Sequence, residues 1–247
     1  MKDEREQSAE SGILFYMNNE KKLAYLHYLK KFVTKERQEK IKEILLLRTR
    51  HVTIALEEVS QSQNVAAIMR TCEAMGLQDA YSIERDSAID IKTNIARGAI
   101  QWMTLHRFQL KNYADPTLAC IQKLQKEGYV VVATSPHATK KVSDLPIDKK
   151  IAFVFGTEIS GLSDKALAAA DERISIPQYG FVESFNVAVS AALCLYDVTT
   201  RLRASDISWQ LSSEEQFDLA LEWMEHSLER PELMKAAFLR SYDENNQ

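Results

Sequence analysis

Apolar and polar positions follow two different periods along the chain, and together they predict an α/β fold. Short apolar runs rich in β-branched residues are typical of buried strands, whereas apolar residues repeated every three or four positions indicate one face of a helix. Because helical segments with short loops separate the strands, the pattern favours a mostly parallel sheet with helices on both faces. The expected strands are 52–56, 80–83, 102–108, 129–134, 151–155 and 173–176.

Cap residues indicate where the helices between the strands begin and end. Ser163 is a good N-cap for a short helix to residue 170. Ser184 is expected to cap a long helix whose first turns are apolar almost all round and therefore buried. Gly76 and Gly128 suit the position that follows a helix.

Helical spacing continues outside the α/β region, at both ends of the chain. One or two helices are expected between 20 and 47, and two more over 213–228 and 231–239. We therefore expect three parts, which are a basic helical extension (1–50), an α/β domain (51–203) and an acidic helical extension (204–247).

Composition narrows the class of protein. The chain has 247 residues and a net charge of −4, and no run approaches the roughly 18 apolar residues of a membrane-spanning helix. The N-terminus lacks the pattern of a signal peptide, so we expect a cytoplasmic protein with no membrane partner. Cys72, Cys120 and Cys194 lie far apart without a CxxC pair, which favours buried thiols over a metal site.

Charge is distributed unevenly between the two ends. Residues 21–50 include ten basic and three acidic residues, and residues 205–247 include three basic and ten acidic residues. A basic N-terminal arm would suit an anionic polymer, but a solvated amphipathic helix accounts for the same charges. Charge alone leaves both interpretations open.

Two polar loops follow neighbouring strands and carry three of the seven glycines. They are GTEISG (156–161) and QYGFVES (178–184), at the carboxyl edge where open α/β sheets bind ligands. In the alternative interpretation both loops are ordinary connections without a ligand, and the spacing of their residues is compatible with that as well. The chain has no GxGxxG, GxxxxGK[ST] or GxSxG motif, so neither a dinucleotide cradle, a P-loop nor a nucleophile elbow is indicated.

A set of polar residues at these strand ends forms the candidate site. Their side chains suit recognition of an anion or a hydroxyl, with the arginine on a phosphate and the others supplying donors and acceptors. In a plainer interpretation the first asparagine only caps a helix and the arginine forms a surface ion pair. The residues are Asn64, Arg70, Glu158, Ser184 and Asn186.

Three blocks of sequence resemble a known family, and this resemblance favours the interpretation of the polar residues as a functional site. NVAAIMRTCEAMGL, FVFGTEISGLS and ISIPQYGFVESFNVAVSAALCLYD resemble, in order and spacing, the three motifs of SpoU/TrmH-type RNA ribose methyltransferases of the SPOUT superfamily. The match runs from about 52 to 203, and the ARGAIQWMTLHRF segment is similar to a further part of that family. At Gln63 and Gln101 the chain differs from the residues that are common in the family. These differences put the contacts with RNA in doubt, but not the methyl-transfer chemistry.

The resemblance implies a fold and a cofactor that no pattern in the chain predicts. Family members tie the C-terminal part of the sheet into a deep trefoil knot, which ordinary chain topology avoids. They work as homodimers and bind S-adenosylmethionine against the knot loops, without a metal. In this chain the implied cofactor-binding residues are Thr134, Gly156, Gly161, Ile176, Gln178 and Phe185.

The resemblance also implies methyl transfer to a ribose 2′-hydroxyl of RNA. Arg70 is expected to act on that hydroxyl together with a substrate phosphate, while Asn64 orients Arg70 and the RNA backbone. Because arginine keeps its proton near neutral pH, we favour charge stabilisation by Arg70 over proton abstraction. The pocket is expected to be organised by Glu158, Ser184 and Asn186.

The acidic helical tail is similar to the C-terminal extension of the TrmH branch, which favours tRNA and guanosine 18 of its D-loop. A 23S ribosomal RNA 2′-O-ribose methyltransferase of the same family is the first alternative. Such relatives often carry an N-terminal RNA-binding domain, for which about 50 residues are too few. A catalytically silent RNA-binding dimer is the second alternative, and the intact candidate residues argue against it.

Overall fold

The structure of the chain is a computed structural model, and it describes residues 17–86 and 98–245. The chain divides into two compact units, of which one comprises 47–210 and the other combines 1–46 with 211–247. The first two residues of the ARGAIQWMTLHRF segment lie outside the described residues.

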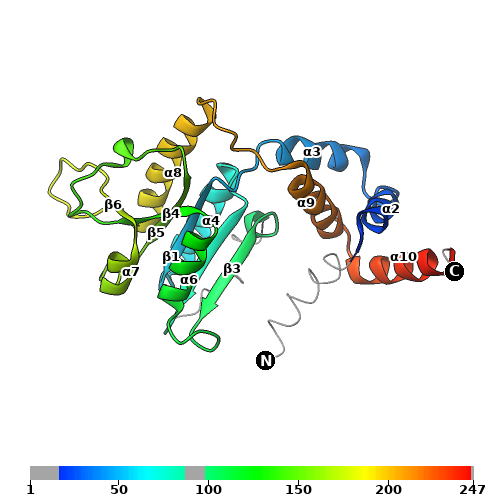
Figure 1. Ribbon diagram of the computed structural model, residues 1–247, viewed down its shortest axis with the longest axis horizontal. Helices are drawn as coiled ribbons and strands as arrows, with labels where there is room; N and C mark the ends of the chain where they lie inside the picture. The colour runs from blue at the N-terminus through cyan, green and yellow to red at the C-terminus, as the bar shows by residue number, and fades with distance from the viewer. Residues whose placement is uncertain (1–16, 87–97, 246–247) are drawn as a thin grey trace. The chain divides into compact units, whose positions relative to one another are not determined.

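The described part of the 47–210 unit contains a six-stranded sheet in which every pair of neighbours is parallel (Figure 1). The order is β3-β2-β1-β5-β4-β6, so β1 and β5 are neighbours, with Leu56 opposite Phe155. This confirms the predicted parallel α/β sheet. The strands are β1 (Val52–Glu57), β2 (Asp79–Glu84), β3 (Thr104–Gln109), β4 (Tyr129–Thr134), β5 (Lys150–Phe155) and β6 (Glu172–Ile174).

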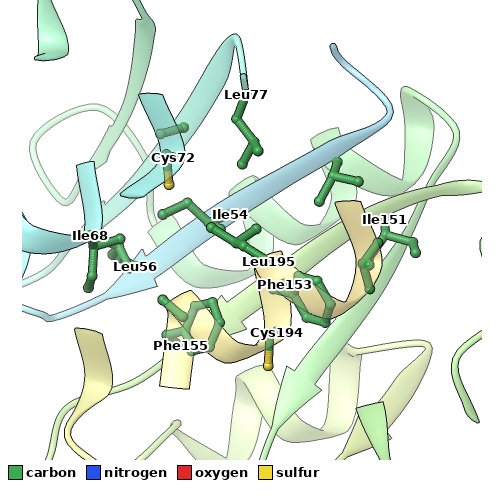
Figure 2. Close-up of a cluster of buried hydrophobic side chains, with 14 of the residues drawn as sticks. Ile54, Leu56, Ile68, Cys72, Leu77, Ile151, Phe153, Phe155, Cys194 and Leu195 are labelled. Carbon is green, nitrogen blue, oxygen red and sulfur yellow. The ribbon is translucent and has the colours of Figure 1, made fainter. Parts of the chain in front are cut away.

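Helices cover both faces of the sheet. Successive side chains of a strand point to opposite faces, and the two central strands therefore build two cores. Ile54 and Phe153 belong to the core that includes residues of α4 (Ser62–Ala74) and α8 (Val187–Arg203). Figure 2 shows this cluster, with Cys72 of α4 and Cys194 and Leu195 of α8 against the sheet. The opposite core contains residues of α6 (Pro116–Lys126) and α7 (Asp164–Ala169).

Two strands have an end that differs by two residues from the prediction, whereas the other strand ends agree within one residue. β3 begins at Thr104 rather than at 102, because the amide of Met103 donates to the Ile100 carbonyl in a turn (3.1 Å). β6 ends at 174 rather than at 176, because Ser175 pairs with the chain before the 3₁₀ turn η1 (Val142–Asp144). The Ser175 amide donates to the Lys140 carbonyl (2.8 Å).

The N-terminal and C-terminal helices together form the second unit. Its helices are α2 (Asn19–Leu29), α3 (Lys35–Leu45), α9 (Ser213–His226) and α10 (Pro231–Asn245). Ion pairs join the basic and acidic ends of the chain, Lys22 to Asp218 (2.6 Å) and Lys21 to Asp243 (2.8 Å). Trp223 is 1% exposed, which fits a packing role. The opposite charges at the two chain ends therefore meet within one unit.

The three cysteines are buried and unpaired, as predicted. Burial raises the pKa of each thiol above its usual value and to about 12 in Cys194. No helix in the described part of the chain combines the length and apolar character needed to cross a bilayer.

Candidate active site

Three connections leave the carboxyl edge of the sheet, after β1, β5 and β6, because all strands of the sheet are parallel. β1 and β5 are neighbours, whereas β4 lies between β5 and β6, so the prediction that GTEISG and QYGFVES follow neighbouring strands is wrong. The connection after β1 leads into α4, the one after β5 leads into α7, and the one after β6 leads into α8. Each carries one of the sequence blocks singled out above. Their side chains therefore have the opportunity to meet at a single place.

A chain of hydrogen bonds links the three connections. The Asn186 side-chain amide donates to the Glu158 carboxylate and to the Asn64 carbonyl oxygen (3.1 Å). The Asn64 amide in turn donates to the side-chain oxygen of Gln61 (2.8 Å). The structure thus brings together three of the five candidate residues, from positions 64, 158 and 186.

Asn186 has a second role as the N-cap of α8. Its side-chain oxygen accepts hydrogen bonds from the amides of Ala188 (2.9 Å) and Val189 (3.4 Å), while its amide nitrogen faces Glu158 and Asn64. The prediction that Ser184 caps this helix is therefore wrong. Asparagine can cap and donate at once, whereas a serine hydroxyl has a single hydrogen to donate.

Arg70 and Ser184 stand apart from this hydrogen-bond chain. Arg70 is exposed on α4, and its guanidinium makes no hydrogen bond or ion pair with any residue that the structure describes. Ser184 is exposed in the connection to α8, and its hydroxyl likewise has no partner among the described residues. The predicted surface ion pair of Arg70 is thus absent from the described part, and both side chains are available to a ligand.

The GTEISG loop is a tight turn closed by backbone hydrogen bonds. The amide of Thr157 donates to the Gly161 carbonyl (3.1 Å), and the Gly161 amide donates back (3.0 Å). Gly161 has a φ of +67°, which favours glycine. A Cβ on Gly156 would lie 2.1 Å from the Gly161 carbonyl oxygen. Gly156 therefore permits a close approach within the loop itself.

The remaining residues implied for cofactor binding lie before and after this loop in the chain, and they differ in burial and in their contacts. Thr134 ends β4, and its hydroxyl donates to the Val154 carbonyl (3.0 Å). Ile176, Gln178 and Phe185 are half-buried in the connection between β6 and α8. This connection therefore offers apolar surface, a side-chain amide and backbone groups for a bound molecule.

An acidic pair at the end of β1 lies beside the loop, and no sequence pattern assigned it a role. Glu57 and Glu58 help to line a cleft of about 310 Å³ together with Arg85 and residues of the 157–164 segment. Glu58 has a φ of +58°, which is uncommon for a residue with a side chain. Its carboxylate accepts hydrogen bonds from the amides of Arg85 and Asp86. Two acidic residues at the end of an apolar strand were the available signal.

A metal centre has no counterpart in the described part of the chain, where no group of three or more His, Cys, Asp and Glu residues could hold an ion. The site offers hydrogen-bonding side chains, the guanidinium of Arg70, which has no partner among the described residues, and a glycine-containing loop closed by backbone hydrogen bonds. This set suits a ligand that carries hydroxyl and phosphate groups.

The fold is that of a parallel α/β protein, and its candidate ligand site lies at the carboxyl edge of the sheet. Residues 51–196 match the model of the SpoU rRNA Methylase family. Because this match spans more than half of the chain, the protein belongs to that family of RNA methyltransferases.

Similar proteins include a tRNA (guanosine(18)-2′-O)-methyltransferase of Borreliella burgdorferi, 37% identical over 196 residues, which span 79% of this chain and 87% of that protein. A protein of the same name from Thermus thermophilus is 32% identical, over 69% of this chain and 86% of its own. A 23S rRNA (guanosine-2′-O-)-methyltransferase of Nitrosomonas europaea is 29% identical over a region that spans 67% of this chain and 63% of that protein.

The fold is similar to solved structures of this family. The TrmH/SpoU tRNA modifying enzyme of A. aeolicus aligns with a TM-score of 0.67 and 24% identity, over 78% of this chain and 98% of its own. A second similar structure is the SpoU methyltransferase AviRb of Streptomyces viridochromogenes in complex with the cofactor AdoMet. It aligns with a TM-score of 0.54 and 22% identity, over 66% of this chain and 62% of its own.

Proposed function

We propose that this protein transfers a methyl group from S-adenosylmethionine to the 2′-hydroxyl of guanosine 18 in tRNA. The observation that carries the proposal is the hydrogen-bond chain from Glu158 through Asn186 to Asn64, formed by the three family motifs in one place. Relatives named for this activity match more than two thirds of the chain. A tRNA substrate would place the reaction in the cytoplasm.

The residues of the site fit S-adenosylmethionine, which when bound supplies the methyl group. Gly161 has open space where a Cβ would stand, so its backbone is accessible to a ligand. Ile176 and Phe185 would contact the adenine ring, and Gln178 would hydrogen-bond polar groups of the cofactor. Thr134 and Gly156 would act indirectly, because their contacts hold β4 and the loop in place.

Arg70 would bind an RNA phosphate and stabilise negative charge on the ribose oxygen. Its guanidinium lacks a protein partner in the described part, and a planar fork of donors suits a phosphate. Asn64 would hold the RNA backbone beside it, and Ser184 would supply a hydroxyl to the pocket. Asn186 would fix the carboxylate of Glu158 by donating to it.

The proposal includes a trefoil knot over the C-terminal part of the sheet. Support comes from the connection between β4 and β5, which later segments contact twice. Ser175 pairs with Lys141, and Arg201 of α8 donates to the carbonyls of Leu145 (2.9 Å) and Val142 (3.2 Å). The chain after β6 would thus pass through this connection before it forms α8.

A homodimer is the proposed assembly, with α8 and the preceding loop at the interface. Val189, Leu193 and Tyr196 form an apolar stripe on α8, each at least 40% exposed, and Phe181 is fully exposed in the loop. Exposed apolar patches of this kind mark protein interfaces. The stripe begins in the first turn of α8, next to Asn186, so a second copy would lie close to the site.

Replacing Tyr196 by glutamate should convert the dimer to a monomer, because the interface would then bury an unpaired charge. Sedimentation analysis of the full chain measures the change. Leu233→Glu is the matched control, since Leu233 is 60% exposed on α10 and lies outside the proposed interface. A wild-type chain that sediments as a monomer would contradict the proposed assembly.

The basic face of α3 is proposed to grip the tRNA backbone. Ile41 and Leu45 of this helix are buried, whereas Lys35 and Lys42 are exposed, so the amphipathic interpretation and the basic-arm interpretation are compatible. Deleting the N-terminal helices would also remove the partners of α9, since Lys22 pairs with Asp218. Charge reversal on the exposed face is therefore the cleaner test.

A Lys35→Glu/Lys42→Glu variant should bind tRNA more weakly and with a flatter salt dependence. Each lost phosphate contact lowers the slope of log K against log salt by roughly 0.9. Filter binding across a salt series measures both effects. Lys126→Glu, at an exposed lysine of α6, is the control. Unchanged slopes in the double variant would mean that the basic face has no part in binding.

Transfer of labelled methyl to unmodified tRNA and to unmodified ribosomal RNA tests the proposed function. We expect label in tRNA. Label in ribosomal RNA alone would favour the second candidate, which the similarity to the Nitrosomonas europaea protein supports. An absence of transfer to either RNA would favour a silent RNA-binding dimer.

A further inference from the structure

Glu57 lies at the end of β1, behind the loop that carries Glu158, and has no assigned part in the reaction. It is 3% exposed, and its carboxylate accepts three hydrogen bonds. Two come from Ser163, from the amide (2.8 Å) and the hydroxyl (2.7 Å), and one comes from the Thr117 hydroxyl (2.7 Å). A buried carboxylate requires such partners, and here they come from the beginnings of α6 and α7.

The residues that flank the GTEISG segment are attached on both sides to a single strand, β1. At the start of the segment, Phe155 pairs with Leu56 in the sheet. Two residues after the segment ends, Ser163 is held by Glu57, which follows Leu56 in β1. The Ser163 hydroxyl also accepts a bond from the Ala166 amide (3.1 Å), so Glu57 fixes the N-cap of α7 as well.

Between these two attachments the loop is closed by its own hydrogen bonds. Thr157 and Gly161 are joined by reciprocal backbone bonds, and the hydroxyls of Thr157 and Ser160 are 2.7 Å apart. Glu158 lies inside this turn, but its partner Asn186 belongs to α8. A displacement at Ser163 would therefore carry Glu158 away from Asn186.

We propose that Glu57 is a positioning residue for this site, whose carboxylate places the 156–163 loop so that Glu158 meets Asn186. The placement of the loop depends on the bonds just described. Its effect on methyl transfer rests on the proposed function.

Hydrogen exchange of the full chain tests the placement without any assay of activity. Glu57→Gln keeps the size of the side chain but removes its charge and replaces one acceptor oxygen by a donor group, so at least one of the three bonds is lost or must reverse its direction. The amides of 157–163 should then exchange roughly tenfold faster, while those of β1 and β5 stay protected. Thr117→Val removes only the bond from α6, and it should leave loop exchange at the wild-type rate.

Coupling between Glu57 and Glu158 separates positioning from a general loss of stability. Glu57→Gln should lower kcat about tenfold with little change in the KM for tRNA. Combined with Glu158→Ala, it should cause no further loss, because both changes remove the contact between position 158 and Asn186. Additive losses, unchanged loop exchange, or equal effects of Thr117→Val would overturn the proposal.

The exchange comparison remains decisive if the Glu57→Gln variant does not fold or if the wild-type chain has no activity. If Glu57→Gln does not fold, Ser163→Gly removes one of the bonds and keeps the Ser163 amide donor, so the same exchange comparison decides the placement. If the wild-type chain methylates no RNA, the proposed function fails, while the exchange comparison still tests the role of Glu57.

Discussion

Methyl transfer by an Arg70→Ala variant should fall by roughly 10²- to 10³-fold in kcat, the loss typical of removing a group that stabilises charge in the transition state. Affinity for S-adenosylmethionine should stay close to that of the wild type. The guanidinium is exposed on α4 and bonds to no residue in the described part, so removing it leaves the loops in place. Single-turnover kinetics and calorimetric titration of the cofactor measure the two effects separately.

Arg70→Lys provides a companion test, because it keeps the charge but loses the planar fork that binds phosphate at two points. Activity between that of the wild type and that of the alanine variant would support phosphate binding by the fork. Loss of cofactor affinity in parallel with activity in Arg70→Ala would contradict the assigned role, since Arg70 would then belong to the cofactor pocket.

A Gly156→Ala variant should lose most of its affinity for S-adenosylmethionine, and its unfolding free energy should fall by about 1–3 kcal/mol. The added Cβ would lie 2.1 Å from the carbonyl oxygen of Gly161 and 2.4 Å from the amide nitrogen of Leu162. Both are backbone atoms, so no side-chain rotation relieves the clash and the loop itself must move. Denaturant unfolding and cofactor titration measure the two losses.

Gly180→Ala is the matched control for this substitution. Gly180 lies in the next loop, and a Cβ there would meet nothing within 4 Å. Its stability should therefore match that of the wild type. Wild-type cofactor binding by Gly156→Ala would contradict the proposal that the tight 156–161 turn forms part of the cofactor site.

The parallel fold could be predicted from sequence because its pattern is local. Ile54 and Leu56 point to one core and Ala55 to the other, and this alternation is visible in the residues themselves. The two-residue error at the start of α8 has a different cause. Serine and asparagine are both good caps, and the choice of Asn186 depends on its long-range bonds to Glu158 and Asn64.

The site could be predicted in part for the same reason. Motif resemblance identified Asn64, Glu158 and Asn186, which the structure brings together. Glu57 remained hidden because its partners lie 60 and 106 residues further along the chain. The basic and acidic ends of the chain also pair over a long distance in sequence, since Lys22 and Asp218 lie 196 residues apart. Local sequence patterns could not predict this pairing.

The central claim is that the protein methylates one oxygen of one nucleotide. Its most direct test compares two synthetic tRNAs that are identical except at guanosine 18, which carries a ribose in one and a 2′-deoxyribose in the other. We predict stoichiometric transfer of labelled methyl to the first tRNA and none to the second. Equal labelling of both would contradict the account, because the methyl group would then reside elsewhere.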